Sequence, residues 1–233
     1  LAYSVPFSAQ DFRCALEGQN ENLAISLLEA NPPVALSVVV PMKRTPLIMA
    51  CRNRIGMEHL VKLLIEKGQD VHAIDPMGWS AVYYACQTGN LKVIKVLVAN
   101  GANLIERDSR GVTPLILATQ HIRIVKYIIS KVKGNLDYIE SSGSFGTTAL
   151  HAAVAAEKQR VVQILLRAGC RVDCWNNNTT QPIGIAAGNR NLQIMSILFD
   201  AGANPYTKDF RNTNLFAIVA QNRYYPGGKF RDA

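Results

Sequence analysis

The sequence predicts an all-α fold in which similar pairs of helices stack one after another along the chain. Two observations predict it. A pattern of 33 residues recurs over most of the 233-residue chain, twice lengthened by two residues. Within each copy, two apolar segments with helical spacing are separated by a polar break, and the second segment ends at a glycine. Each copy is therefore expected to form a turn followed by two helices.

Residues 75–107 are the most regular of the early copies of this pattern. An Asp-x-x-Gly turn signal leads into a first helix that starts after Ser80, and a Thr-Gly-Asn break precedes a second helix expected over Leu91–Ala99. Gly101 follows 21 residues after Ser80, and the next helix cap, Thr113, follows 12 residues after Gly101. These two steps recur along the chain, with two-residue insertions near residues 52–57 and after Gly134. Such regular spacing indicates a repeat.

The predicted helix boundaries have local physical reasons. Thr45-Pro46 and Thr113-Pro114 are typical helix starts, because the hydroxyl accepts from a free helix amide and proline lacks an amide that would have no partner. Glycines suit the left-handed position that ends a helix. Small residues inside the first helices, such as Cys51 and Cys86, are expected to let neighbouring pairs pack closely. The second helices carry apolar stripes, for example Leu60, Leu63 and Leu64, that face the next copy.

The sequence resembles the ankyrin repeat family in these motifs. The best matches are DSRGVTPLILA at 108–118, TALHAAV at 148–154 and the Gly-Ala-Asn runs at 101–103 and 202–204. The resemblance implies an ankyrin-repeat solenoid of stacked helix-turn-helix units with β-hairpin fingers. It also implies that partners bind on the concave side, through the finger tips and the exposed end of each first helix.

The repeat frame divides the chain into seven parts. They are an N-terminal capping helix pair at 1–39, ankyrin repeats at 40–74 and 75–107, an ankyrin repeat with an enlarged hairpin at 108–142, ankyrin repeats at 143–175 and 176–208, and a partial C-terminal ankyrin repeat at 209–233.

Composition limits the cellular setting. The five cysteines, an odd number, favour a reducing compartment over a disulfide framework. No apolar run is long enough to span a membrane, and the N-terminus has no signal-peptide pattern. Because the chain starts with Leu1, we expect it to be part of a longer protein. The cytoplasm is the expected location, with the nucleus or the cytosolic face of a membrane as alternatives.

No residue pattern points to catalysis, so we expect no enzyme activity, cofactor, metal or small-molecule substrate. His151, in Thr-x-Leu-His, is expected to tie a helix start to nearby backbone, and Cys170 and Cys174 lack the second pair that a zinc site needs. The net charge of +8 and the pI of 9.4 raise the question of nucleic acid. However, Lys92 and Lys126 occupy ordinary solvent positions of the second helices without interleaved aromatic residues, so nucleic-acid binding is not favoured.

A protein or peptide partner is expected at positions that the fold leaves free. Large apolar groups and arginines at such positions are typical of binding sites. Trp79 is the first choice, and an acidic partner is favoured because Arg44, Arg107 and Arg110 would attract carboxylates. The candidate protein-binding residues are Arg44, Met77, Trp79, Tyr83, Gln87, Arg107, Arg110, Val112, Phe145, Trp175 and Phe210.

The leading functional hypothesis is a non-catalytic protein–protein interaction module, a scaffold or adaptor, that binds its partner along the concave groove. Three alternatives remain. The chain could be the cytosolic ankyrin domain of a membrane channel or palmitoyl transferase, the substrate-recruitment module of a ubiquitin ligase, or a self-assembling structural array.

Overall fold

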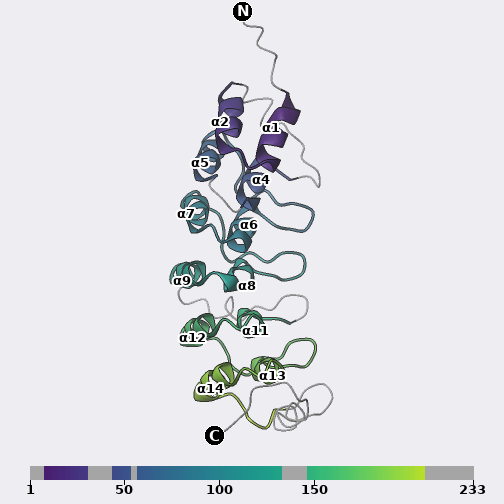
Figure 1. Cartoon of the computed structure of the whole chain (residues 1–233), viewed down its shortest axis with the longest axis vertical. Helices are drawn as coiled ribbons and strands as arrows, with labels where there is room; N and C mark the ends of the chain where they lie inside the picture. Colours follow the sequence, from purple (N-terminus) through teal and green to yellow (C-terminus); the bar gives the residue numbers. More distant parts are fainter. Residues whose placement is uncertain (1–7, 31–43, 54–56, 133–145, 208–233) are drawn as a thin grey trace, which may run out of the picture. The chain divides into compact units, whose positions relative to one another are not determined.

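The computed structural model describes residues 8–30, 44–53, 57–132 and 146–207. The chain divides into two units, residues 1–109 and 110–233. In each unit, successive layers hold one first helix and one second helix (Figure 1). This arrangement confirms the all-α repeat fold expected from the sequence. The expected enlarged hairpin and the partial repeat at 209–233 fall almost entirely outside the described residues.

Three helix pairs make up the described part of the first unit. Helices α1, α4 and α6 pack in a row, and α2, α5 and α7 pack in a second row beside it. The helices are α1 (Ala9–Glu17), α2 (Glu21–Ala30), α4 (Pro46–Arg52), α5 (Glu58–Glu66), α6 (Ala81–Thr88) and α7 (Leu91–Ala99).

Side-chain caps fix several of these helix starts. Thr45 accepts a hydrogen bond from the backbone N–H of Ile48 at the start of α4, where Pro46 occupies the first turn. Asn90 accepts from the N–H of Val93 at the start of α7. Both caps satisfy amides that have no partner inside their own helix.

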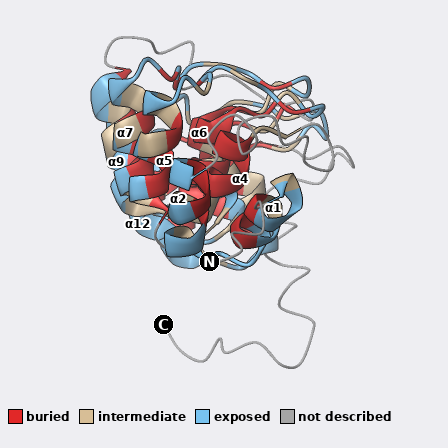
Figure 2. Ribbon diagram, turned by 90° about the horizontal axis from the view of Figure 1, so that it is seen from above, coloured by how far each residue is buried: buried red, intermediate tan, exposed pale blue. Residues whose placement is uncertain are grey.

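The core of the first unit lies along α4 and α6, where buried residues concentrate (Figure 2). Both helices are enclosed by neighbours in their own row and by the second helices, so nearly their whole circumference is buried. Cys51 and Cys86 lie in this core as the small-residue pattern predicts, and burial raises the pKa of both thiols. In contrast, α5 buries a single stripe made of Leu60, Val61 and Leu64.

The second unit has the same organisation. Its first helices form one row and its second helices, α9, α12 and α14, form another. The first helix at 114–120 is short and finishes as a 3₁₀ turn, η2, because the loop to α9 is tight: the N–H of His121 bonds the carbonyl of Ala118. The elements are α8 (Pro114–Leu117), η2 (Ala118–Gln120), α9 (Ile122–Lys131), α11 (Ala149–Ala155), α12 (Gln159–Arg167), α13 (Pro182–Gly188) and α14 (Leu192–Asp200).

The segments between helix pairs, here called fingers, are turns rather than long hairpins wherever the structure describes them. In the Asp75 finger, residues 70–80, Ile74 and Ser80 form an isolated antiparallel bridge. Across the described ranges no finger contains an extended strand. The β-hairpin geometry implied by the family resemblance is therefore reduced to tight, side-chain-supported turns.

Candidate functional site

The Asp75 finger is built around the carboxylate of Asp75. Oδ1 accepts from the backbone N–H of Met77 at 2.9 Å and of Trp79 at 3.1 Å. The backbone of Asp75 also exchanges hydrogen bonds with its own turn, donating to Trp79 and accepting from Gly78. Gly78 sits at φ 78°, a left-handed conformation that glycine adopts without strain. The Asp-x-x-Gly sequence thus folds into the turn that it predicts.

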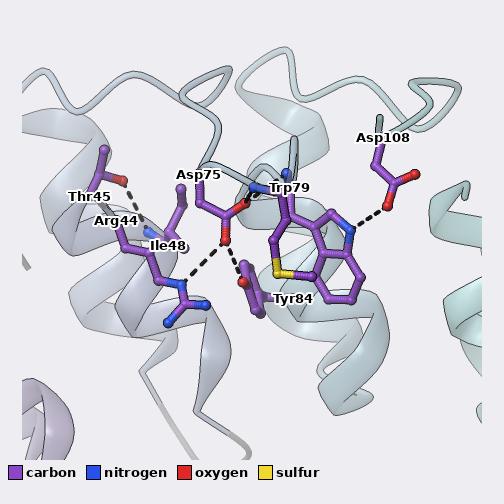
Figure 3. A network of polar contacts seen from close by, with 8 residues as sticks. Arg44, Thr45, Ile48, Asp75, Trp79, Tyr84 and Asp108 are labelled. Carbon is purple, nitrogen blue, oxygen red and sulfur yellow. Dashed lines mark hydrogen bonds and ion pairs between the residues drawn. The ribbon is translucent and has the colours of Figure 1, made fainter. Parts of the chain in front are cut away.

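The second oxygen of Asp75 joins two further residues. Tyr84 of α6 donates its hydroxyl to Oδ2 at 2.6 Å, and Arg44 Nε lies 3.3 Å from the same oxygen (Figure 3). The Arg44 guanidinium also lies over the Tyr84 ring, 5.5 Å from its centroid. Burial alone would raise the pKa of Asp75, but hydrogen bonds from Tyr84, Trp79, Met77 and Arg44 outweigh it and lower the pKa. Asp75 is therefore held as a buried, fully paired carboxylate.

Trp79 is part of this framework instead of a free surface group. Its indole N–H donates to Asp108 Oδ2 at 2.7 Å, and only 6% of the residue is exposed. Its ring stacks on Tyr83 at 5.9 Å and meets Tyr84 edge-on at 5.2 Å between centroids. The indole thereby connects the Asp75 finger to the Asp108 finger, residues 103–109 (Figure 3).

Three candidate residues therefore do not match the expectation that they are free. Trp79 and Tyr83 are buried in the core, because the adjacent finger and the stacked rings cover them. Arg44 keeps only 10% of its side chain exposed, because its charge is paired with Asp75. These side chains shape the surface from beneath and are unavailable as direct contacts for a partner.

Other candidates do lie at the surface. Met77 is 39% exposed and Trp175 is 51% exposed, while Gln87, Arg107 and Arg110 are exposed and Val112 is half-buried. Phe145 and Phe210 lie outside the described residues. In the first unit, Met77 and Arg107 belong to fingers in contact, since Ser109 donates its hydroxyl to the Met77 carbonyl at 3.3 Å.

The candidate residues omit three of the most exposed apolar side chains. Ile74 is 60% exposed, Tyr206 is 75% exposed and Ile105 is 43% exposed. Ile74 and Arg107 occupy the same place in consecutive repeats, directly before the turn aspartate. The repeat position of Ile74 could have identified it as a candidate from the sequence, because the family pattern does not require an apolar residue there.

His151 has the structural role expected from its motif. Its Nδ1 lies 2.9 Å from the hydroxyl of Thr148 and accepts from the Thr148 N–H, while Nε2 lies 3.1 Å from the carbonyl of Thr180. The residue is completely buried, and this burial lowers its pKa although its hydrogen bonds to Thr180 and Cys174 act in the opposite direction. A neutral imidazole therefore ties helix α11 to the next finger.

The described residues contain no group of three or more His, Cys, Asp or Glu residues that could hold a metal ion. Helices in this part of the chain are all too short or too polar to cross a bilayer. The exposed candidate side chains in the described fingers are the apolar Met77 and Trp175 and the arginines Arg107 and Arg110.

Comparisons with known proteins give the same fold. A family model described as ankyrin repeats (three copies) matches residues 47–139 and 133–209. The nuclear factor NF-kappa-B p105 subunit of Gallus gallus is 25% identical over 201 residues, covering 82% of this chain and 20% of that protein. A Danio rerio protein named as a candidate palmitoyltransferase, ZDHHC13, is 31% identical over 145 residues, covering 62% of this chain and 22% of that protein. The crystal structure of the human ASB11 ankyrin repeat domain superposes with a TM-score of 0.77 at 21% identity, covering 94% of this chain and 92% of that one. The chain thus spans about a fifth of the length of these two curated relatives.

Proposed function

Because the chain belongs to the ankyrin repeat family, we propose that it is a non-catalytic module that binds a partner protein or peptide across its fingers. The observation that carries the proposal is the pairing of exposed apolar side chains with an exposed arginine on two fingers in contact. Ile74 and Met77 supply the apolar part, and Arg107 supplies the charge. Such a combination is typical of protein-binding surfaces.

The framework beneath this surface supports the proposal. A contact surface binds more tightly when its backbone is already fixed, because less conformational entropy is lost on binding. The Asp75 turn is fixed by two side-chain-to-backbone hydrogen bonds, and Trp79 connects it to the Asp108 finger. Arg107 sits directly before Asp108, so the same connection limits where its guanidinium can reach. A partner with a carboxylate close to an apolar side chain fits this arrangement.

A binding experiment with selected peptides tests the proposal. Peptides would be selected from a random display library on the purified chain, and their affinities measured by fluorescence anisotropy. We expect the double variant Ile74→Ser, Arg107→Glu to weaken the selected peptides about tenfold or more, since it removes an apolar anchor and reverses a charge. Leu23→Ser, Lys95→Glu is the matched control, because it makes the same two chemical changes at exposed positions of α2 and α7.

Two results would refute the proposal in different ways. Equal affinities for the Ile74/Arg107 variant and the parent chain would show that the partner surface lies elsewhere. If no selected peptide bound the folded chain more tightly than the unfolded chain, the proposal of a peptide-binding module would lose its support altogether.

A second candidate function places this module inside a membrane-bound acyltransferase. Its support is the Danio rerio relative, of which the match covers 22%. Palmitoyl transfer by the natural full-length protein, measured with labelled palmitoyl-CoA, tests this candidate. Full-length protein that transfers no label to itself or to a mixture of acceptor proteins would eliminate it and leave the interaction module.

A further inference from the structure

The two units differ in the balance of their charges. The described residues of the first unit include eight Lys and Arg residues and ten Asp and Glu residues. The described residues of the second unit include nine Lys and Arg residues but only three Asp and Glu residues. The basic excess of the described residues therefore belongs to the second unit.

This excess gathers on the neighbouring helices α9 and α12. Neither helix contains an Asp or a Glu, and together they carry Arg123, Lys126, Lys131, Arg160 and Arg167, all of them exposed. The two helices pack side by side in the second-helix row (Figure 1). We call the surface formed by these five residues the α9–α12 basic face.

The buried stripes show how the two helices are aligned. Ile124, Val125 and Ile128 are the buried residues of α9, and Val161, Val162 and Leu165 occupy the same spacing in α12. Arg123 directly precedes the first stripe and Arg160 directly precedes the second. The two arginines therefore occupy equivalent positions on adjacent helices, and both project to the solvent side of the row.

Two lysines on the second helices of the first unit form exposed ion pairs with one glutamate, and Lys92, directly before the buried stripe of α7, matches the position of Arg123 and Arg160. Lys62 of α5 lies 3.7 Å from a Glu58 carboxylate oxygen, and Lys92 of α7 lies 3.5 Å from the other oxygen of the same residue. One glutamate thus serves two adjacent second helices. No carboxylate is available within α9 or α12 to do the same for Arg123 and Arg160. Like charges on one face repel, so this arrangement costs stability unless a counter-charge comes from elsewhere.

A shallow cavity of about 340 Å³ lies at one edge of this face, where α9 and α12 begin. Its lining includes Arg160, Lys158 and Gln120, together with Glu157 as the one carboxylate. His121 and Lys158 stand at the cap positions of the two helices, and neither makes a side-chain cap hydrogen bond to the helix amides. In α7 and α14 the same positions are Asn90 and Asn191, which do cap. The helix starts thus add to the positive potential of the basic face.

We propose that the α9–α12 basic face binds a carboxylate-rich segment of a partner protein. Charge complementarity selects this occupant: Arg123 and Arg160 hold carboxylates, and the cavity receives one further acidic side chain near Lys158. A membrane surface fits less well, because none of the exposed large apolar side chains among the described residues belongs to α9 or α12; Leu192 and Phe199 are exposed on the neighbouring helix α14. Nucleic acid fits less well because Tyr127 is only half-exposed and lies under Lys131, so its ring offers little stacking surface.

Fluorescence anisotropy with a labelled peptide of about twelve residues, in which Glu alternates with Ser, tests the assignment. We expect the acidic peptide to bind the parent chain with an affinity that falls as salt rises. Arg123→Glu, Arg160→Glu should weaken binding about tenfold, because each reversal replaces an attraction by a repulsion. The neutral pair Arg123→Gln, Arg160→Gln should give a smaller loss in the same direction. Circular dichroism and thermal unfolding check that each variant keeps the fold.

The matched control is Lys62→Glu, Lys92→Glu in the first unit, which changes the net charge equally at exposed positions. It should weaken the peptide less than about twofold. Equal losses for both pairs, or no loss for the arginine pair, would overturn the proposal. Vesicles containing phosphatidylserine and a single-stranded oligothymidine are the competing probes. Tighter binding of either, with loss in the Arg123/Arg160 variants, would assign the face to a membrane or to nucleic acid instead.

Discussion

Asp75→Asn is the most informative single substitution in the finger framework. Asn retains one carbonyl oxygen that can accept from the N–H groups of Met77 and Trp79, so the turn itself is preserved. Asn176 shows that an amide suffices for this task, since its Oδ1 accepts from the N–H groups of Asn178 and Thr180 in the equivalent turn. The substitution therefore isolates what the negative charge contributes.

The expected cost follows from the two contacts of Oδ2. The 2.6 Å hydrogen bond from Tyr84 ends on a charged acceptor, and such bonds contribute about 2 kcal/mol. Removing one partner of a buried ion pair costs about 3 to 5 kcal/mol. Because Arg44 makes a single contact of 3.3 Å with Asp75, we expect the loss of this pair to cost less than that. We expect Asp75→Asn to lower the free energy of unfolding by about 3 kcal/mol at neutral pH.

Urea unfolding followed by circular dichroism measures this change, and hydrogen exchange at the amides of Met77 and Trp79 locates it. Tyr84→Phe should account for about 2 kcal/mol of it. Asp70→Asn is the control, because Asp70 also accepts from a backbone N–H, that of His72, but is exposed and should change stability by less than about 0.5 kcal/mol. An Asp75→Asn variant within about 0.5 kcal/mol of the parent chain would refute the reasoning.

The pH dependence provides a second check on Asp75. Its folded-state pKa is lowered, so its charge contributes stability above the unfolded pKa, near 3.9, and loses it as pH falls through the folded value. The difference between the parent chain and Asp75→Asn should therefore shrink below about pH 4. A difference that stays constant down to pH 2 would contradict the assignment of the stabilisation to the carboxylate charge.

Two further predictions follow from the second unit. Gly146→Ala should lower the free energy of unfolding by about 2 kcal/mol or more, because an added Cβ would lie 2.7 Å from the backbone nitrogen of Asn177. Gly202 also has a positive φ but an added Cβ would meet nothing within 4 Å, so Gly202→Ala should cost only about 1 kcal/mol. Equal costs for the two variants in urea unfolding would contradict the close approach at Gly146. His151 is held neutral with a lowered pKa, so stability should be complete above its unfolded pKa of about 6.5 and decline as pH falls below it. His151→Gln should flatten the unfolding free energy between pH 7 and pH 5, and an unchanged slope would contradict this role.

The helices were predictable because their signals are local. The second helix expected over Leu91–Ala99 coincides with α7, and the Thr45 and Thr113 caps both accept from the expected backbone amides. Hydroxyl caps, prolines and apolar spacing act within a few residues of one another, so a linear pattern contains all the information they need. The family assignment follows from the same signals taken at a fixed period.

The role of Trp79 was not predictable in this way. Its position at a finger tip suggested exposure, but its indole is covered by rings from α6 and bonded to Asp108, 29 residues later. The period does place Asp108 next to the Asp75 turn, so proximity could have been inferred. Whether the indole turns inward or outward depends on the space left by Tyr83 and Tyr84, and that is a packing question. Arg44 was misjudged for the same reason, since its partner lies one repeat ahead.

The contacts between consecutive fingers have a consequence for how the chain can be divided. Trp79 donates to Asp108, Arg44 pairs with Asp75, and His151 lies against the carbonyl of Thr180; in each case the second residue lies beyond the repeat boundary expected from the sequence. A fragment that stops at residue 107 would leave the indole N–H without its acceptor although the sequence repeat is complete. A repeat transferred into another repeat protein must therefore include the first turn of the repeat that follows it.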